Sequence, residues 1–369
     1  MKLVNVSDVC NEVFAGGDVP KDNWVKEPTS THNIPIYSNG EANDGLYGYT
    51  DYFRVKEPSV TVSARGTIGY TVVRMEPFVP VVRLITLVPK TEVIDLKYLC
   101  YAIQNYKFDG TGTSIPQLTV PMLKQYTFKL VDLAEQKRIV QVIDKIADLI
   151  KNRKQQLQKL DELVKARFVE MFGNPILNEK NNRISPLNEV CIKITDGTHD
   201  TPVRCPDGYL LVTGKNIREK GIIFDEVEYV SEEDHRLIYN RCNPEYGDVL
   251  YTNIGVNYGT ACFNNLHYEF SMKNVALLKP NKEIINGYYL WECLNLMRSH
   301  LLEMNQVGGA QTFMSLSTIK KITIPVSDIK LQAEFADFVE EIDKSKLNVQ
   351  KSLNKLETLK KALMQKYFG

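Results

Sequence analysis

His199 has the side chain best placed for acid–base chemistry, because carboxylates flank it in the run Asp196-Gly197-Thr198-His199-Asp200. Histidine exchanges a proton near neutral pH and also binds metals. Polar loop residues of this kind more often form turns or contact a ligand, and the sequence places no further ligands that complete a zinc site. We therefore expect neither catalysis nor a metal at His199.

Three short motifs match parts of DNA-modifying active sites, but each is incomplete. Asp95-Leu96-Lys97 and Asp328-Ile329-Lys330 match the tail of a nuclease motif, yet the first lies in a predicted helix and the second caps one. Asn174-Pro175-Ile176 lacks the second proline and the aromatic residue with which an adenine methyltransferase holds a flipped base. The sequence also has no G-x-x-x-x-G-K-S/T loop for ATP. We predict that the chain has no catalytic residues, binds no cofactor and is not an enzyme.

Composition limits the classes of function that remain. The sequence is 43% apolar and 24% charged, which is typical of a globular protein, and no apolar run is long enough to cross a membrane. The N-terminus lacks the pattern of a secretory signal, and the seven cysteines are scattered without a C-x-x-C pair. We expect a cytoplasmic protein without disulfides. The 45 basic and 45 acidic residues cancel, so a role on DNA must rest on local patches or on basic partners.

The chain contains a duplication. Residues 132–173 align without a gap on residues 328–369, at a constant offset of 196 residues. The matched pairs include Asp132 with Asp328, Gln136 with Gln332, Phe172 with Phe368 and Gly173 with Gly369. An ungapped repeat of this length indicates a repeated structural unit. We therefore expect the order globular part, helix, globular part, helix.

Each copy is predicted to be one long helix that begins after an aspartate N-cap and ends at a glycine. Apolar residues recur at steps of three and four, which is the pattern of a coiled-coil seam. The predicted seam consists of Ile139, Ile143, Ile146, Ile150, Leu157 and Leu160 in the first copy and of Ile342, Val349, Leu353, Leu356 and Leu363 in the second. We expect the two copies to pair with each other as antiparallel helices; the alternative is a coiled coil between separate chains.

The segments outside the helices, 1–131 and 174–327, are much less alike, but the order of their parts repeats. Both contain an alternating stretch typical of a β-hairpin, SVTVSARGTIGYTVVR in the first and GDVLYTNIGVNYGTACF in the second. Each later has a helical stretch, near 95–106 and 285–304, and then a glycine-rich loop before its long helix. We predict an α+β fold of two such domains, 1–131 and 174–327, separated by spacer helices 132–173 and 328–369.

The whole chain resembles the specificity subunit of a type I restriction-modification system. The resemblance is carried by LAEQKRIV at the first helix, by DGTHDTPV with the following VTGKNI, and by GTSIPQLTVPMLKQ before that helix. It implies two target-recognition domains that each read one half of a bipartite DNA site. It also implies that methyltransferase subunits, two of them, dock on the helices and bind S-adenosylmethionine, and that restriction subunits join for cleavage. The second helix departs from the family pattern because it begins with KLQAEFADF.

Base reading requires side chains with paired donors and acceptors on loops that reach a groove of the DNA. For each residue taken singly, a solvated loop position is at least as good an interpretation as a DNA contact. The candidates in the first domain are Lys21, Tyr37, Ser38, Asn39, Arg65, Thr67, Ser114, Gln117 and Lys124. Those in the second are Lys215, Asn216, Arg218, Asn253, Asn257, Tyr258, Gln311, Thr312 and Lys320. Of these candidates, Lys21, Lys124 and Lys320 are predicted to contact backbone phosphate and not a base. Because the two sets differ, we expect an asymmetric target. Recognition domains at opposite ends of an antiparallel helix pair predict half-sites about one helical turn apart.

Two other classes of function stay open on the residues alone. One is an enzyme with cryptic methyltransferase or nuclease motifs, and the other is a coiled-coil adaptor that binds only proteins. Binding of S-adenosylmethionine by the purified chain favours the first alternative. Selection of a bipartite DNA duplex excludes the second.

Overall fold

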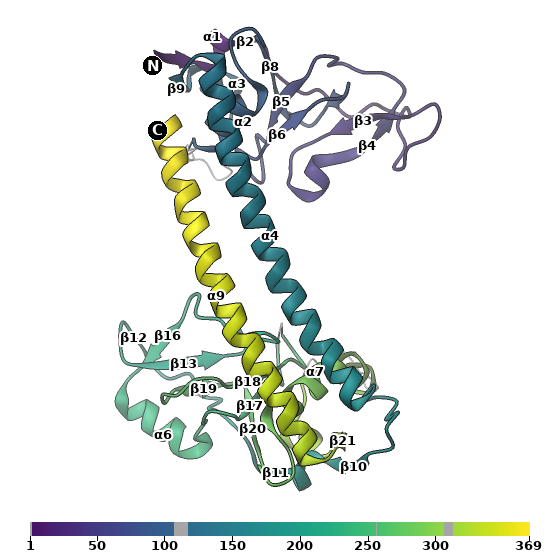
Figure 1. Ribbon diagram of the computed structural model, residues 1–369, viewed down its shortest axis with the longest axis vertical. Coiled ribbons are helices and arrows are strands. Elements are labelled where there is room, and N and C mark those ends of the chain that lie inside the picture. Colours follow the sequence, from purple (N-terminus) through teal and green to yellow (C-terminus); the bar gives the residue numbers. More distant parts are fainter. Residues whose placement is uncertain (1, 107–116, 256, 306–312) are drawn as a thin grey trace. The chain divides into compact units, whose positions relative to one another are not determined.

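The computed structural model describes residues 2–106, 117–255, 257–305 and 313–369. The chain forms two compact units. Unit 1 contains Met1–Lys154 and Lys351–Gly369, and unit 2 contains Gln155–Gln350. Each unit therefore combines one of the predicted recognition domains with parts of both long helices (Figure 1).

Unit 1 is built on a four-stranded sheet with the order β2-β8-β5-β6 and a three-stranded sheet with the order β4-β3-β7. A separate pair, β1 and β9, joins the start of the chain to the segment before the first long helix. The strands are β1 Lys2–Asn5, β2 Cys10–Ala15, β3 Ile34–Tyr37, β4 Leu46–Thr50, β5 Ser59–Val62, β6 Thr71–Arg74, β7 Val79–Pro80, β8 Ile85–Pro89 and β9 Thr127–Leu130. The short helices are α1 Val6–Val9, the 3-10 helix η1 Ala42–Gly45, α2 Leu96–Gln104 and α3 Val120–Gln125.

Unit 2 repeats this plan, with a four-stranded sheet of order β11-β20-β17-β18, a second sheet of order β12-β16-β13-β19 and the pair β10 and β21. It adds a small hairpin, β14 with β15, and helix α6. The strands are β10 Arg183–Pro186, β11 Cys191–Asp196, β12 Arg204–Cys205, β13 Tyr209–Thr213, β14 Ile217–Arg218, β15 Gly221–Ile222, β16 Glu228–Val230, β17 Val249–Tyr251, β18 Ala261–Phe263, β19 Ser271–Lys273, β20 Ala276–Pro280 and β21 Thr323–Val326. The helices are α5 Leu187–Val190, α6 Glu232–Cys242, α7 Gly287–Asn305 and α8 Leu316–Lys320.

The predicted hairpins are present in both units. β5 pairs with β6 and β17 with β18, each pair antiparallel and each next to the strand that precedes the helical stretch. An irregularity in the pairing also repeats. The register between β2 and β8 shifts just after Cys10, and that between β11 and β20 shifts just after Cys191. The repeat predicted from the order of parts is therefore a repeat of strand topology.

The two long helices are α4, Leu133–Phe172, and α9, Ile329–Phe368. The caps predicted for them are confirmed, since the Asp132 carboxylate accepts the backbone N–H of Glu135 at 2.9 Å and that of Asp328 accepts from Lys330 at 2.9 Å. Within the described ranges, no helix is both long enough and apolar enough to cross a membrane.

Each unit packs the start of one long helix against the end of the other. In unit 1, Ile139 of α4 shares a buried core with Met364 and Phe368 of α9. In unit 2, Phe335 of α9 shares a core with Phe168 and Phe172 of α4. The helices are therefore antiparallel partners within one chain, as predicted.

The predicted seam divides into a buried and a half-buried set. Those buried are Ile139, Ile143, Ile146, Val349 and Leu353. Those half-buried are Ile150, Leu157, Leu160, Ile342, Leu356 and Leu363. The buried seam residues of α4 lie toward its start, where the helix also covers the core of unit 1.

A buried glutamine fixes each long helix to the helix that follows the sheet. The Gln136 side chain accepts from the backbone N–H of Asp95 at 2.8 Å and donates to the carbonyls of Val93 at 3.0 Å and Val131 at 2.8 Å. Gln332 makes the same three bonds to the corresponding backbone atoms at 2.8, 3.2 and 2.8 Å. Because a buried amide without partners is costly, each glutamine sets the position of its helix on its own unit.

Candidate nucleic-acid interface

Three of the predicted recognition segments in unit 1 contact one another. Asn39, just after β3, accepts a hydrogen bond through its side-chain oxygen from the backbone N–H of Ala64 at 2.8 Å. At the hairpin turn, Arg65 donates to the side-chain oxygen of Gln117 at 3.0 Å. The loop after β3, the β5–β6 turn and the segment before α3 thus form one surface.

The exposed groups on this surface come from the β5–β6 turn. Arg65 and Thr67 are exposed, and Gly66 between them has φ of +69°, a conformation that favours glycine. Gln117 is half-buried. Arginine and glutamine offer the paired donors and acceptors used for reading guanine and adenine.

Tyr37, Ser38 and Asn39 lie in the framework of this surface instead. The Tyr37 hydroxyl donates to Glu76 at 2.7 Å, and the Arg74 guanidinium lies 3.5 Å from the centre of its ring. Burial, with the bond to Glu76, raises the pKa of Tyr37 to about 12. Asn39 also donates to the carbonyl of Val82 at 2.6 Å, and Ser38 is half-buried. The Asn39 side chain therefore holds the backbone of the loop, and Tyr37 is held by Glu76 and Arg74. Base contacts by Tyr37, Ser38 and Asn39 stay a prediction.

Unit 2 brings the corresponding segments together. Asn257 of the β17–β18 turn donates to the carbonyl of Gly214, which follows β13, at 2.8 Å. In the same turn, the backbone carbonyl of Asn253 accepts the N–H of Met314 at 2.9 Å, and the Asn253 side-chain amide donates to the Met314 carbonyl at 3.3 Å. The turn therefore contacts both the loop after β13 and the segment before α8, as its counterpart does in unit 1.

A groove of about 400 Å³ opens beside these loops. Its lining includes the predicted residues Lys215 and Asn257 and three residues that sequence reasoning missed, Arg204, Lys273 and Asn274. Lys273 donates to the Thr201 hydroxyl at 2.5 Å. Three cations against one carboxylate, Glu228, make the groove positive, and Glu228 itself pairs with Arg204 at 2.8 Å. A positive groove beside polar loops suits a phosphate backbone next to base edges.

Asn216 and Asn253 belong to the framework of unit 2. Asn216 is buried and closes its own turn by accepting from the backbone N–H of Thr213 at 3.0 Å. Asn253 is 1% exposed. Both side chains are used inside the protein, so we revise their predicted base contacts to positioning roles. Arg218 is exposed, and Tyr258 is half-buried with its carbonyl bound by Arg298 at 2.9 Å.

His199 stabilises the edge of the same groove. Its Nε2 lies 2.6 Å from the buried carboxylate of Asp196, which also binds Arg241, and its Nδ1 lies 3.1 Å from the side-chain oxygen of Asn274. A side chain on the neighbouring Gly197 would bring its Cβ within 2.0 Å of the Met272 carbonyl oxygen. This tight arrangement gives His199 a structural role. In the part of the chain that the structure describes, no group of three or more His, Cys, Asp and Glu side chains could hold a metal ion.

The remaining predicted contacts are three exposed lysines and three residues outside the described ranges. Lys124 in the last turn of α3 and Lys320 in the last turn of α8 are equivalent, and both are exposed. Lys21 is also exposed. Ser114, Gln311 and Thr312 lie outside the described residues.

Comparison with known proteins agrees with this arrangement. The family model of the type I restriction modification DNA specificity domain matches residues 1–162. A putative type I specificity subunit of Mycoplasma pneumoniae is 34% identical over 167 residues, which are 45% of this chain and 46% of that protein. The C-terminal part of another from the same organism is 36% identical over 130 residues, which are 35% of this chain and 88% of that relative.

The matched segment spans about half the length of the first curated relatives, 46% of one and 53% of another. The crystal structure of the S subunit of a type I restriction-modification system from M. genitalium extends the comparison to the whole chain. It covers 100% of this chain and 96% of its own at a TM-score of 0.62, with 18% sequence identity. This likeness concerns the fold, and it includes both units.

Proposed function

The chain belongs to the family of type I restriction-modification specificity subunits, and on that premise we propose that it reads an asymmetric, bipartite DNA sequence for partner enzymes. Membership of this family agrees with the prediction that the chain is a recognition subunit and not an enzyme.

One observation carries the proposal. In each unit, segments far apart in the sequence converge at a hairpin turn on the same scaffold, through Arg65 and Gln117 in unit 1 and through Asn257 and Gly214 in unit 2. Repeated scaffolds with different loop side chains are suited to two sites of different specificity, since binding residues concentrate on loops that a rigid scaffold positions. We assign one half-site to each unit, with Arg65 and Thr67 reading one and Lys215, Arg218 and Asn257 contacting the other.

We further propose that the helices dock the partner enzymes. Leu163 of α4 and its equivalent Leu359 of α9 are each 46% exposed, although they are apolar. Val142, Leu149 and Leu347 on the same helices are also exposed. The exposed pair that the duplication repeats, Leu163 and Leu359, suits two copies of one partner, which we propose to be the methyltransferase subunit carrying S-adenosylmethionine, with restriction subunits joining for cleavage. The assembly would methylate adenine or cleave DNA in the cytoplasm.

The divergent start of the second helix bears on this docking. Phe335, in KLQAEFADF, occupies the position of Ile139 in the first copy, and its side chain is buried. Part of the divergence therefore serves the core of unit 2. Docking of a partner on α9 would then depend on the exposed side chains near Phe335.

The test is selection of duplexes from random DNA by the full chain together with the methyltransferase subunit. We expect enrichment of two different short sequences separated by a fixed number of unread bases. A lack of enrichment would contradict the proposal and favour an adaptor that binds only proteins. Methyl transfer by the chain without its partner would favour the enzyme.

A further inference from the structure

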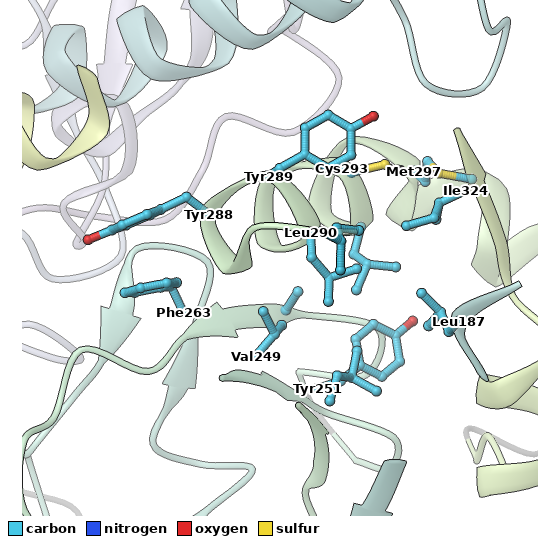
Figure 2. Packing of buried hydrophobic residues seen from close by; sticks show 14 of the residues in the cluster. Leu187, Val249, Tyr251, Phe263, Tyr288, Tyr289, Leu290, Cys293, Met297 and Ile324 are labelled. Carbon is cyan, nitrogen blue, oxygen red and sulfur yellow. Dashed lines mark hydrogen bonds between the residues drawn. The ribbon is translucent and has the colours of Figure 1, made fainter. Parts of the chain in front are cut away.

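Unit 2 contains a small pocket that the DNA-reading proposal does not use. It has a volume of about 60 Å³, which corresponds to roughly four to six waters at the usual 10–15 Å³ each. Its walls come from α4, from the β14–β15 turn, from α7 and from α9. Phe263, Tyr288 and Trp291 form its aromatic part, and Figure 2 shows the rings of Phe263 and Tyr288 side by side at one end of α7.

A buried carboxyl group lines this pocket. Glu292 of α7 is 1% exposed, and its Oε1 has no hydrogen-bond partner among the residues that the structure describes. Burial raises the pKa of this carboxyl from 4.5 to about 7. A buried oxygen without a partner is costly, so this atom is suited to a ligand that donates a hydrogen bond.

The other carboxylates of the pocket already have cations. Asp161 binds Lys220 at 2.6 Å and Lys346 at 2.8 Å. Glu219 binds Lys165 at 3.2 Å, and Asp343 lies 3.3 Å from Lys346. Four carboxylates thus face three lysines, and the carboxylate without a lysine partner is that of Glu292. Arg298 adds a second cation to Glu219 at 3.5 Å, so among the described residues Glu292 is the carboxyl group of this pocket that has no ion pair.

The position of Glu292 is occupied by a different residue type in unit 1. Tyr98 and Tyr289 are equivalent, because each donates to a carbonyl in the strand before its long helix. Three residues further on, unit 1 has Tyr101, whose hydroxyl donates to Asp144 of α4 at 2.5 Å. In unit 1 the Tyr101 side chain therefore bonds directly to α4, whereas in unit 2 the Glu292 carboxyl group lines a pocket.

We propose that this pocket binds a guanidinium group, held by the Glu292 carboxylate against the aromatic wall. Guanidinium is planar, stacks on aromatic rings and is more weakly hydrated than an ammonium ion, so moving it from water onto the aromatic wall of the pocket costs less free energy. The Glu292 carboxylate is the acceptor that we assign to it, since the side chain of Asn295 is bound to both backbone groups of Ala261 at 3.0 Å. A group of four or five heavy atoms fits the volume.

The test is a titration of the full chain with methylguanidinium, followed by calorimetry or NMR. We expect saturable binding to one site at pH 8, about tenfold weaker at pH 6, because at pH 6 roughly nine-tenths of Glu292 carries a proton that the cation must displace. Besides burial, four charged groups affect the pKa of Glu292. Lys165 and Lys346 lower it, and Glu219 and Asp161 raise it. Absence of saturable binding at pH 8 would overturn the proposal.

Two variants make the assignment specific. Glu292→Gln should abolish binding, and Glu283→Gln, which removes the same charge from an exposed position of unit 2, should leave it unchanged. Equal binding by Glu292→Gln and the parent chain would place methylguanidinium elsewhere. The pH comparison uses the unaltered chain, so it stands even if the Glu292 variant folds poorly.

A guanidinium group is offered both by free small molecules and by an arginine of another protein. Adding the methyltransferase subunit proposed above separates these sources. Displacement of bound methylguanidinium by that subunit assigns the site to a partner arginine. Simultaneous binding of both assigns it to a free cation.

Discussion

Replacing Phe368 with alanine tests whether the end of α9 belongs to the core of unit 1. Phe368 is 3% exposed, and its ring centre lies 4.8 Å from that of Tyr98. It shares a buried core with Ile139 and Ile143 of α4. Truncating a buried phenylalanine costs about 3–5 kcal/mol, from lost burial and the remaining cavity. We expect unit 1 to lose this much stability although the change lies one residue from the last residue of the sequence.

Hydrogen exchange resolves the effect by unit. At a factor of ten per 1.4 kcal/mol, Phe368→Ala should lower the protection of β5 and β6 by roughly 100-fold to 4,000-fold and leave β17 and β18 unchanged. Phe172→Ala is the matched control, since Phe172 is also 3% exposed and its ring lies 4.8 Å from that of Tyr289 in unit 2. It should produce the reverse pattern. Leu359→Ala, at an exposed position, should stay within about 0.5 kcal/mol.

Loss of protection in β17 and β18 on Phe368→Ala would refute this reasoning. So would a Phe172→Ala variant that destabilises β5 and β6. Either result would mean that the two helix ends do not belong to the cores to which the packing assigns them.

Three further predictions concern other parts of the chain. Burial raises the pKa of Glu292 from 4.5 to about 7 in the folded chain. The free energy of unfolding should therefore be highest below pH 4.5, where Glu292 is protonated in both states, and should fall by about 3 kcal/mol as the pH rises to 7. Urea unfolding at pH 5 and pH 8 should show this loss in the parent chain and not in Glu292→Gln. Gln136→Ala should cost unit 1 about 1–3 kcal/mol by leaving buried backbone groups unpaired, and Gln332→Ala should do the same to unit 2, as measured by hydrogen exchange. Inserting four residues after both Lys154 and Gln350 lengthens each helix by about 6 Å, so duplex selection should return a spacer longer by one or two base pairs with both half-sites unchanged.

The duplication and the two β-hairpins could be predicted from the sequence because both depend on local patterns. The ungapped repeat at an offset of 196 residues predicted two equivalent helices, and alternation with glycine-containing turns predicted both hairpins. The helix α6 was missed, although Ser231 at its start and acidic residues in its first turn are ordinary signals of a helix N-terminus.

The groove could not be predicted, because it depends on contacts between distant segments. Lys273 lies at the groove with Lys215 because β19 pairs in parallel with β13, which brings Ser271 opposite Leu211. A short apolar strand carries no signal of its partner or direction. The same limit explains Asn253, whose residue type favours a base contact but whose burial gives it a partner inside the protein, Met314.

The central claim is that each unit reads its own half-site, and paired loop variants test it most directly. Duplex selection with the methyltransferase subunit would compare the parent chain with Arg65→Ala/Thr67→Ala in unit 1 and Lys215→Ala/Asn257→Ala in unit 2. We predict that each variant relaxes one half of the target, by about 1–3 kcal/mol for each lost base contact, and leaves the other half unchanged. Relaxation of both halves by one variant, or no change in either half from both variants, would contradict the claim.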